Sequence, residues 1–278
     1  MSHFFSLAPV ARILLRSCVL VCCMVASGTL PVAAQSGSLF SIPVNAKWMA
    51  TDKLQQLYVV TTANEVIKYL ANGQEQYRFS NNILGALTHV DATDPFNLLL
   101  YYFDYQTVVL LDRTLNKTAE YKLTNAGFAQ VRTVGTSNDG AIWVYDEAAF
   151  RLYKIDRQAK ILHESPDLSL LLGQAPQPTQ LLARDNWVYM SDPQLGILVF
   201  DNFGQYAKTL DIKGVSQFQI IDNRLVFREG AQLQITDLQS FQYGTMALPE
   251  AAVNAAQVLV HKNRLYIRNQ VGIIVQTF

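Results

Sequence analysis

Short apolar runs recur along the chain at a nearly constant spacing. Each run is three residues long, consists mostly of Leu, Ile, Val and Tyr, and is followed after one intervening residue by a turn-type polar residue. The six runs lie at residues 57–59, 100–102, 142–144, 188–190, 225–227 and 265–267. Successive runs begin 37 to 46 residues apart. A period of about forty residues indicates an array of small, similar structural units.

Each repeat contains four short strand-like segments, one before the apolar run, the run itself and two after it. The segments are rich in Val, Ile, Leu, Tyr and Phe, and the joints between them in Asn, Asp, Gly and Gln, as is typical of strands and turns. No window sustains a helical period, although residues 166–173 have the pattern of one helical turn. The sequence therefore predicts an all-β fold, a six-bladed β-propeller with four-stranded antiparallel blades.

The two ends of the repeat array complement one another. The sixth repeat has three strand-like segments, whereas residues 39–44 form an extra one before the first repeat. We expect this extra segment to complete the last blade, because a strand without a partner would leave an exposed sheet edge. The ring would then be closed by the N-terminal strand.

The amino-terminal segment does not follow the repeat pattern. It carries Arg12 and Arg16 without any acidic residue, and an apolar stretch covers residues 18–30. Val32 and Ala34 are small residues at the two positions that a signal peptidase reads, which predicts cleavage after Ala34. A retained membrane anchor is the alternative, but the stretch is shorter than the roughly 20 residues that a spanning helix needs.

The predicted organisation is a cleaved signal peptide, residues 1–34, followed by a single propeller domain, residues 35–278. All three cysteines, Cys18, Cys22 and Cys23, precede the predicted cleavage point. The exported chain would therefore have no disulfide, cysteine nucleophile or thiolate metal ligand. The expected location is the periplasm or the extracellular space, with a bacterial envelope favoured, and no other segment is long enough to span a bilayer.

Composition narrows the partner classes. Of the 278 residues, 50% are hydrophobic and 16% are charged, and 22 basic residues balance 22 acidic ones. Such a chain can bury a large core, and it has no overall field that would attract nucleic acid. Basic residues also do not cluster, so we expect no nucleic-acid partner.

The fourth repeat resembles a known repeat family. Residues 188–206 read VYMSDPQLGILVFDNFGQY, in which a strand ends at Asp192, a second strand ends in Val-Phe-Asp at Asp201, and Gly204 follows. This arrangement is similar to the NHL-type repeat. The resemblance implies a six-bladed propeller but no particular activity, since NHL-like propellers include lyases, lactonase-like enzymes and pure binding modules.

Recurring aspartates are the most conspicuous polar residues. Asp104, Asp146 and Asp192 occupy the same place in three successive repeats, where a strand enters a hairpin turn. A carboxylate ring could bind a metal, but Asp at such positions commonly accepts hydrogen bonds from the backbone N–H groups of the turn. We interpret these aspartates as structural.

Five other residues are candidates for a binding site. His89 and His261 lie in the innermost strands of their blades, and Asp91 shares a strand face with His89. A channel histidine beside a carboxylate could act as a general base or a zinc ligand, or could simply line the channel. Trp48 and Tyr105 are aromatic rings that could stack on a sugar or anchor a protein partner.

Two functions remain open at this point. The first is an exported, non-catalytic propeller that acts as a binding or scaffold platform for a protein or an envelope glycan, with no catalytic residue, metal or cofactor. Its recognition elements would be the longer joints at residues 92–96 and 166–178. The second is a metal-dependent lactonase- or lyase-like enzyme that uses channel residues such as His89, Asp91 and His261. Nucleophile-elbow, phosphate-loop and dinucleotide motifs are absent from the sequence.

Overall fold

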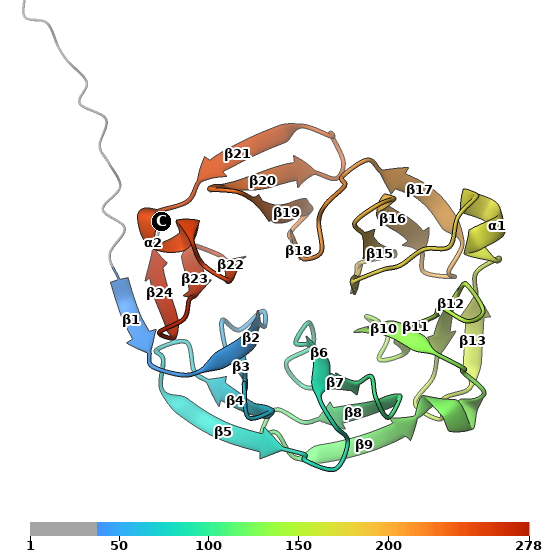
Figure 1. The fold of residues 1–278 in the computed structure, drawn as a ribbon, viewed down its shortest axis with the longest axis horizontal. Coiled ribbons are helices and arrows are strands. Elements are labelled where there is room, and N and C mark those ends of the chain that lie inside the picture. The colour runs from blue at the N-terminus through green and yellow to red at the C-terminus, as the bar shows by residue number, and fades with distance from the viewer. Residues whose placement is uncertain (1–37, 278) are drawn as a thin grey trace, which may run out of the picture. The chain divides into compact units, whose positions relative to one another are not determined.

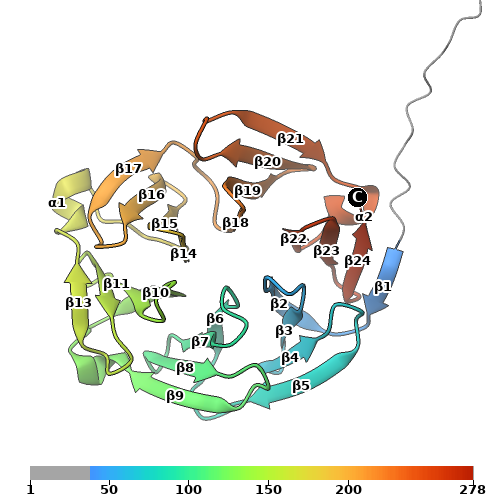
Figure 2. The ribbon, with the colours of Figure 1, turned by 180° about the vertical axis from the view of Figure 1, so that it is seen from behind.

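The computed structural model describes residues 38–277, which form six four-stranded antiparallel sheets arranged as blades around a common axis (Figure 1). The predicted six-bladed propeller is confirmed. The innermost strands of the blades are β2 (Ala46–Thr51), β6 (Leu87–Asp91), β10 (Val131–Thr136), β14 (Gln180–Arg184), β18 (Phe218–Ile221) and β22 (Gln257–His261). The same ring is seen from behind in Figure 2.

The apolar runs of the sequence are the second strands of the blades. These strands are β3 (Leu57–Thr61), β7 (Leu98–Tyr102), β11 (Ile142–Asp146), β15 (Trp187–Asp192), β19 (Arg224–Glu229) and β23 (Arg264–Arg268). Every residue of β3, β7 and β11 is buried. The runs are continuous rather than alternating because each blade is covered by another blade on both faces.

The third strands are also largely buried, and the outermost strands are partly exposed. The third strands are β4 (Glu65–Tyr69), β8 (Thr107–Leu111), β12 (Arg151–Ile155), β16 (Gly196–Asp201), β20 (Gln232–Asp237) and β24 (Ile273–Thr277). The outermost strands are β5 (Glu75–Ser80), β9 (Lys117–Lys122), β13 (Ile161–Glu164), β17 (Tyr206–Leu210), β21 (Tyr243–Ala247) and β1 (Ser38–Ile42). The hydrophobic core therefore lies between neighbouring blades.

The N-terminal strand closes the ring as predicted. β1 pairs with β24 in antiparallel register, with Phe40 opposite Val275 and Ile42 opposite Ile273 (Figure 1). The Phe40 ring also covers the turn of the first blade, where a Cβ on Gly73 would lie 2.5 Å from the ring. The last blade is thus built from both ends of the described chain.

Two of the three recurring aspartates cap turns, as predicted. The Asp146 carboxylate accepts hydrogen bonds from the backbone N–H groups of residues 129, 130 and 148, and Asp192 accepts those of residues 177, 194 and 195. Each carboxylate also joins a turn to the connection that precedes its blade. Within residues 38–277, the Asp104 carboxylate makes no such bond, so the capping interpretation holds for Asp146 and Asp192 alone.

Three short helices lie in connections between blades. The predicted turn is α1 (Leu168–Leu172), which begins after Asp167, whose side chain accepts from the N–H groups of residues 169 and 170, and ends at Gly173 with a φ of 73°. A 3-10 helix (Leu123–Ala126) and α2 (Glu250–Val253) were not predicted, because one turn is too short to show a period. None of the helices in the described part of the chain is long and apolar enough to cross a membrane.

The antiparallel strand order gives the ring two distinct faces. The loops between the first and second strand of every blade emerge on one face, which we call the inner-hairpin face. The connections from one blade to the next emerge on the opposite face, the connection face. The predicted signal peptide, residues 1–34, lies outside the described residues.

Candidate functional site

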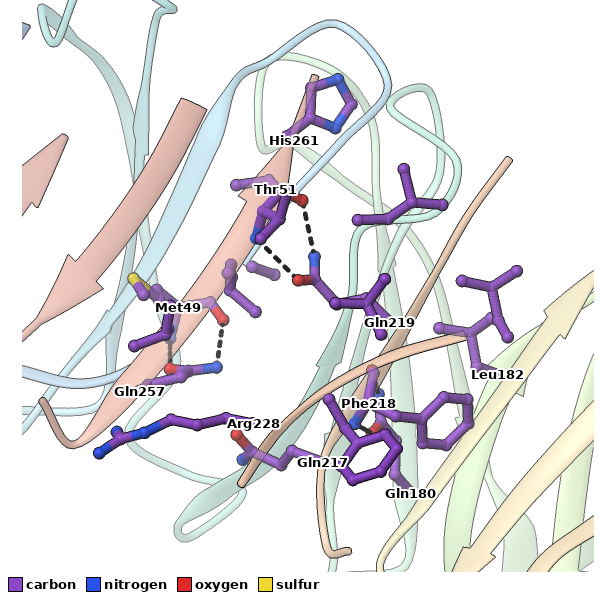
Figure 3. A pocket seen from close by; sticks show the side chains of 18 of the residues that line it. Met49, Thr51, Gln180, Leu182, Gln217, Phe218, Gln219, Arg228, Gln257 and His261 are labelled. Carbon is purple, nitrogen blue, oxygen red and sulfur yellow. Dashed lines mark hydrogen bonds between the residues drawn. The ribbon is translucent and has the colours of Figure 1, made fainter. Parts of the chain in front are cut away.

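A cavity with a volume of about 600 Å³ lies in the central channel. Its lining comes from the innermost strands of five blades, β2, β6, β14, β18 and β22, from β19 and β20 of the fifth blade, and from the hairpins and connections at their ends. Part of this lining is shown in Figure 3. A cavity of this size falls in the range of roughly 300–1,000 Å³ that is typical of small-molecule sites. The channel cavity is therefore the candidate functional site.

Three glutamines form a repeated clamp along the cavity wall. Gln180, Gln219 and Gln257 each stand in an innermost strand and bind the backbone of the innermost strand of the next blade (Figure 3). The side-chain oxygens accept from the N–H groups of residues 218, 260 and 49 at 2.8, 2.8 and 2.9 Å. The side-chain nitrogens donate to the carbonyls of the same three residues at 3.1, 3.1 and 2.9 Å.

These clamps satisfy backbone groups that a propeller leaves open. An innermost strand has a sheet partner on one side only, and its free N–H and C=O groups are costly to bury without a partner. Each amide supplies one acceptor and one donor, as a neighbouring strand would. The first blades use other side chains, since Asn64 binds the N–H of residue 87 and the carbonyl of residue 85.

Sequence reasoning missed the glutamine clamps. The sequence does contain a pattern that marks them: Gln occurs at the first or second position of the innermost strand in three successive repeats. Glutamine is common in the joints as well, so composition alone does not separate the two uses.

Four of the five candidate residues line the cavity. They are Trp48, His89, Asp91 and His261. The Trp48 ring is partly buried against the core of the first two blades, and its centroid lies 6.0 Å from that of His89 at a tilt of 44°. Tyr105 does not join them: it is 50% exposed in the turn between β7 and β8, on the connection face.

Asp91 has a structural role in this arrangement. Its Oδ1 accepts from the Thr93 N–H at 2.8 Å and its Oδ2 from the Thr136 N–H at 2.7 Å. The second bond joins β6 to β10 of the next blade. Because both oxygens already accept backbone hydrogen bonds and only 7% of the residue is exposed, Asp91 is poorly placed to act as a base or metal ligand.

The two histidines each carry a buried, unpartnered ring nitrogen. Within the described residues, the Nε2 atoms of His89 and His261 make no hydrogen bond. Burial lowers the pKa of both imidazoles below the usual 6.5. At His89 the negative charge of Asp91 opposes this shift, and at His261 the positive charge of Lys262 increases it. Both rings are therefore neutral at pH 7.

This burial predicts a loss of stability on mild acidification. The unfolded chain takes up a proton at each histidine near pH 6.5, whereas the folded protein takes it up only at lower pH. The melting temperature should be flat above this pH and fall as pH drops from about 7 to about 5. The H89Q/H261Q variant should have a shallower profile, measured by thermal denaturation in matched buffers. A wild-type profile no steeper than that of the variant would contradict the prediction.

Metal ligation finds little support in the side-chain arrangement. Across residues 38–277, no group of three or more His, Cys, Asp or Glu side chains is placed to hold a metal ion. The second carboxylate in the lining, Asp52, accepts from the Tyr58 hydroxyl and from two backbone N–H groups. Burial raises the pKa of Asp52.

Comparison with known proteins finds similarity in structure alone. No family model matches the chain, and no curated protein matches it in sequence. A streptogramin B lyase is 13% identical over 88% of this chain and 86% of that chain, with a TM-score of 0.59. A catalytically inactive virginiamycin B lyase from Staphylococcus aureus, solved with quinupristin, is 13% identical over 88% of this chain and 98% of that chain, with a TM-score of 0.60.

A third solved structure is PorZ of Porphyromonas gingivalis, described as an essential bacterial surface component of the type-IX secretion system. It is 13% identical, and the match covers 83% of this chain and 30% of that chain with a TM-score of 0.55. The shared property is the fold. At this identity neither lyase activity nor a secretion role follows for this chain.

Proposed function

We propose that this chain is an exported, non-catalytic propeller that binds a protein partner through its inner-hairpin face. One observation carries the proposal: the inner hairpins of three blades carry exposed apolar side chains beside residues that line the channel. Leu54, Phe96 and Trp187 are 53%, 55% and 42% exposed. Each lies within three residues of a residue that lines the cavity, and large apolar and aromatic residues are typical anchors of protein interfaces.

The opposite face has exposed apolar residues too, but these are dispersed. Ile83 and Leu170 lie in connections that start from outermost strands, and Val271 lies in the turn between β23 and β24. The inner hairpins, by contrast, converge on the channel. The two loops predicted from the sequence to be recognition elements therefore lie on opposite faces of the propeller. Residues 92–96 lie on the inner-hairpin face and residues 166–178 on the connection face.

The longer of these loops is engaged in holding blades together. The Pro176 carbonyl accepts from the Tyr145 hydroxyl, and the Pro178 carbonyl accepts from the Arg132 Nε. We therefore assign recognition to the shorter loop, which contains Phe96.

Export is part of the proposal and rests on residues 1–34. The similar fold of PorZ, a bacterial surface component, is compatible with a location in the cell envelope. The NHL-like relationship likewise rests on the motif at residues 188–206, where the turn after Asp201 closes at Gly204 with a φ of 82°.

The test compares two faces of the same protein. The L54S/F96S/W187S variant should lose capture of a partner from the envelope fraction of the source cells at least about tenfold, since interface anchors are worth about 2 kcal/mol or more each. The I83S/L170S/V271S variant, with three residues that are 81–83% exposed, is the matched control. Equal capture by both variants would refute the assignment, and capture that survives proteolysis of the extract would indicate a glycan.

An enzyme remains the second candidate. It is favoured by the two unpartnered histidine nitrogens in the cavity and by a fold that two lyases share. The engaged carboxylates of Asp52 and Asp91 weigh against the metal-dependent form of this hypothesis.

A further inference from the structure

Cationic side chains gather at one mouth of the channel cavity. Lys53 lies two residues after the innermost strand β2, Lys262 directly follows β22, and Arg184 is the last residue of β14. All three line the cavity. Because the innermost strands of all blades run in the same direction along the channel, their carboxyl ends meet at the same mouth, on the inner-hairpin face.

In the described part of the chain, these three charges have no protein counter-ion. Among the ion pairs of residues 38–277, none involves Lys53, Arg184 or Lys262. The fourth cation in the lining, Arg228, differs because it donates to the carbonyls of residues 230, 253 and 255. It lies at the other end of the cavity from His261 (Figure 3).

The carboxylates of the lining do not offset this charge where it is exposed. Asp52 and Asp91 are 1% and 7% exposed, and their oxygens accept hydrogen bonds from the Tyr58 hydroxyl or from backbone N–H groups. Only Asp222 is an exposed acidic residue of the lining. At this mouth the lining therefore carries the exposed cations Lys53 and Lys262 and the half-buried Arg184, against one exposed carboxylate.

His261 lies close to these cations. Among the described residues its buried Nε2 has no hydrogen-bond partner. Its pKa is lowered first by burial and then by Lys262; Asp52 opposes this shift, and Arg184 and Arg264 add smaller contributions that lower it. The positive charges are therefore close enough to act on the cavity interior. Further along the channel the wall includes the half-buried apolar side chains of Trp48, Leu182 and Leu259.

We infer that the channel mouth binds an amphipathic organic anion, with its carboxylate or similar group held by Lys53, Arg184 and Lys262 and its apolar body in the channel. This deepens the proposed function, because it names the chemistry of the group that enters the cavity on the recognition face. Charged hydrogen bonds hold the anionic group, and the apolar walls bury the body of the ligand.

The test uses a fluorescent anion and its neutral analogue. 8-Anilinonaphthalene-1-sulfonate should bind the wild-type protein saturably at one site, with an affinity that falls as salt rises. In the K53Q/R184Q/K262Q variant its dissociation constant should rise at least about tenfold, a loss of about 1.4 kcal/mol. Binding of the uncharged N-phenyl-1-naphthylamine should change little, because its apolar contacts remain.

A second variant controls for net charge. K122Q/R157Q/K160Q removes three exposed cations that lie outside the cavity lining, so its affinity for the anionic probe should match that of the wild type. Equal affinity in the mouth variant and the wild type would overturn the inference. Equal loss in both variants, or equal loss of the neutral probe, would overturn it as well.

Competition identifies the source of the anion. Displacement of the probe by N-acetylphenylalanine would support a free carboxylate, and displacement by a blocked Phe-Asp-Phe amide would support an acidic side chain of a partner. The two proposals can be refuted independently. The L54S/F96S/W187S variant tests binding of a protein partner, and the K53Q/R184Q/K262Q variant tests binding of the anion.

Discussion

A chain that begins at Pro43 should lose most of its stability, because β1 closes the ring. Truncation removes four residue pairs between β1 and β24 and the buried side chain of Ile42. It also removes Phe40 from the turn at Gly73. At about 1 kcal/mol per hydrogen bond and about 2 kcal/mol per buried apolar side chain, the loss is about 6–8 kcal/mol, comparable with the total stability of many domains. Thermal and urea denaturation would measure it.

The same truncation should also change the oligomeric state. It exposes the edge of β24, whose residues Ile273, Ile274 and Val275 are apolar, and such an edge recruits a strand from another chain. We expect concentration-dependent association by light scattering. A synthetic peptide of residues 36–45 added in trans should restore the monomer and raise the melting temperature, whereas a scrambled peptide should do neither. A truncated chain that stays monomeric and melts like the full propeller would contradict this account.

The propeller could be predicted because its determinants are local and repeated. A buried second strand such as β7 reads as a continuous apolar run, and turn residues such as Asp146 and Asp192 occur at a constant offset from it. Ring closure followed from counting strands, without knowledge of any contact.

The site was less predictable because its contacts join different repeats. His89 and His261 could be assigned to innermost strands, but nothing local indicates that their Nε2 atoms lack partners. The sequence alone makes Asp91 a candidate for catalysis, but in the structure its carboxylate accepts a hydrogen bond from the N–H of Thr136, 45 residues away. Tyr105 is a candidate because its side chain is aromatic. Only the strand topology shows that it lies on the connection face of the propeller.

Buried lysines illustrate the same limit. Lys68 and Lys154 stand at the same position of their third strands and are each 2% exposed. Lys154 donates to the Asn202 side chain at 2.9 Å and pairs with Asp139 at 2.7 Å. A lysine in a strand normally indicates a solvent-facing position. The burial of Lys154 is made tolerable by Asn202 of the next blade together with Asp139 of its own blade.

A close approach between two innermost strands predicts a second large effect, at Gly135. This residue lies in β10, where a Cβ would stand 2.6 Å from the Leu181 Cδ2 and 3.0 Å from the Leu181 carbonyl oxygen of β14. A side chain cannot fit without moving one innermost strand away from the other, and the backbone oxygen cannot rotate aside. Gly135→Val should therefore destabilise the protein by about 3 kcal/mol or more, which lowers the melting temperature by about 6–12 °C in a domain of this size.

Gly244→Val provides the matched control for this prediction. Gly244 also lies within a strand, β21, but no atom stands within 4 Å of the position of its Cβ. Valine there should be neutral or stabilise by up to about 1 kcal/mol, because it favours the strand and restricts the unfolded chain. The contrast isolates blade contact from the general effect of replacing a strand glycine. If both variants melted at the same temperature, the close approach of β10 to β14 would not constrain the propeller. A loss of stability confined to Gly135→Val would establish that the contact between these two strands, which no glutamine side chain bridges, requires a residue without a side chain at position 135.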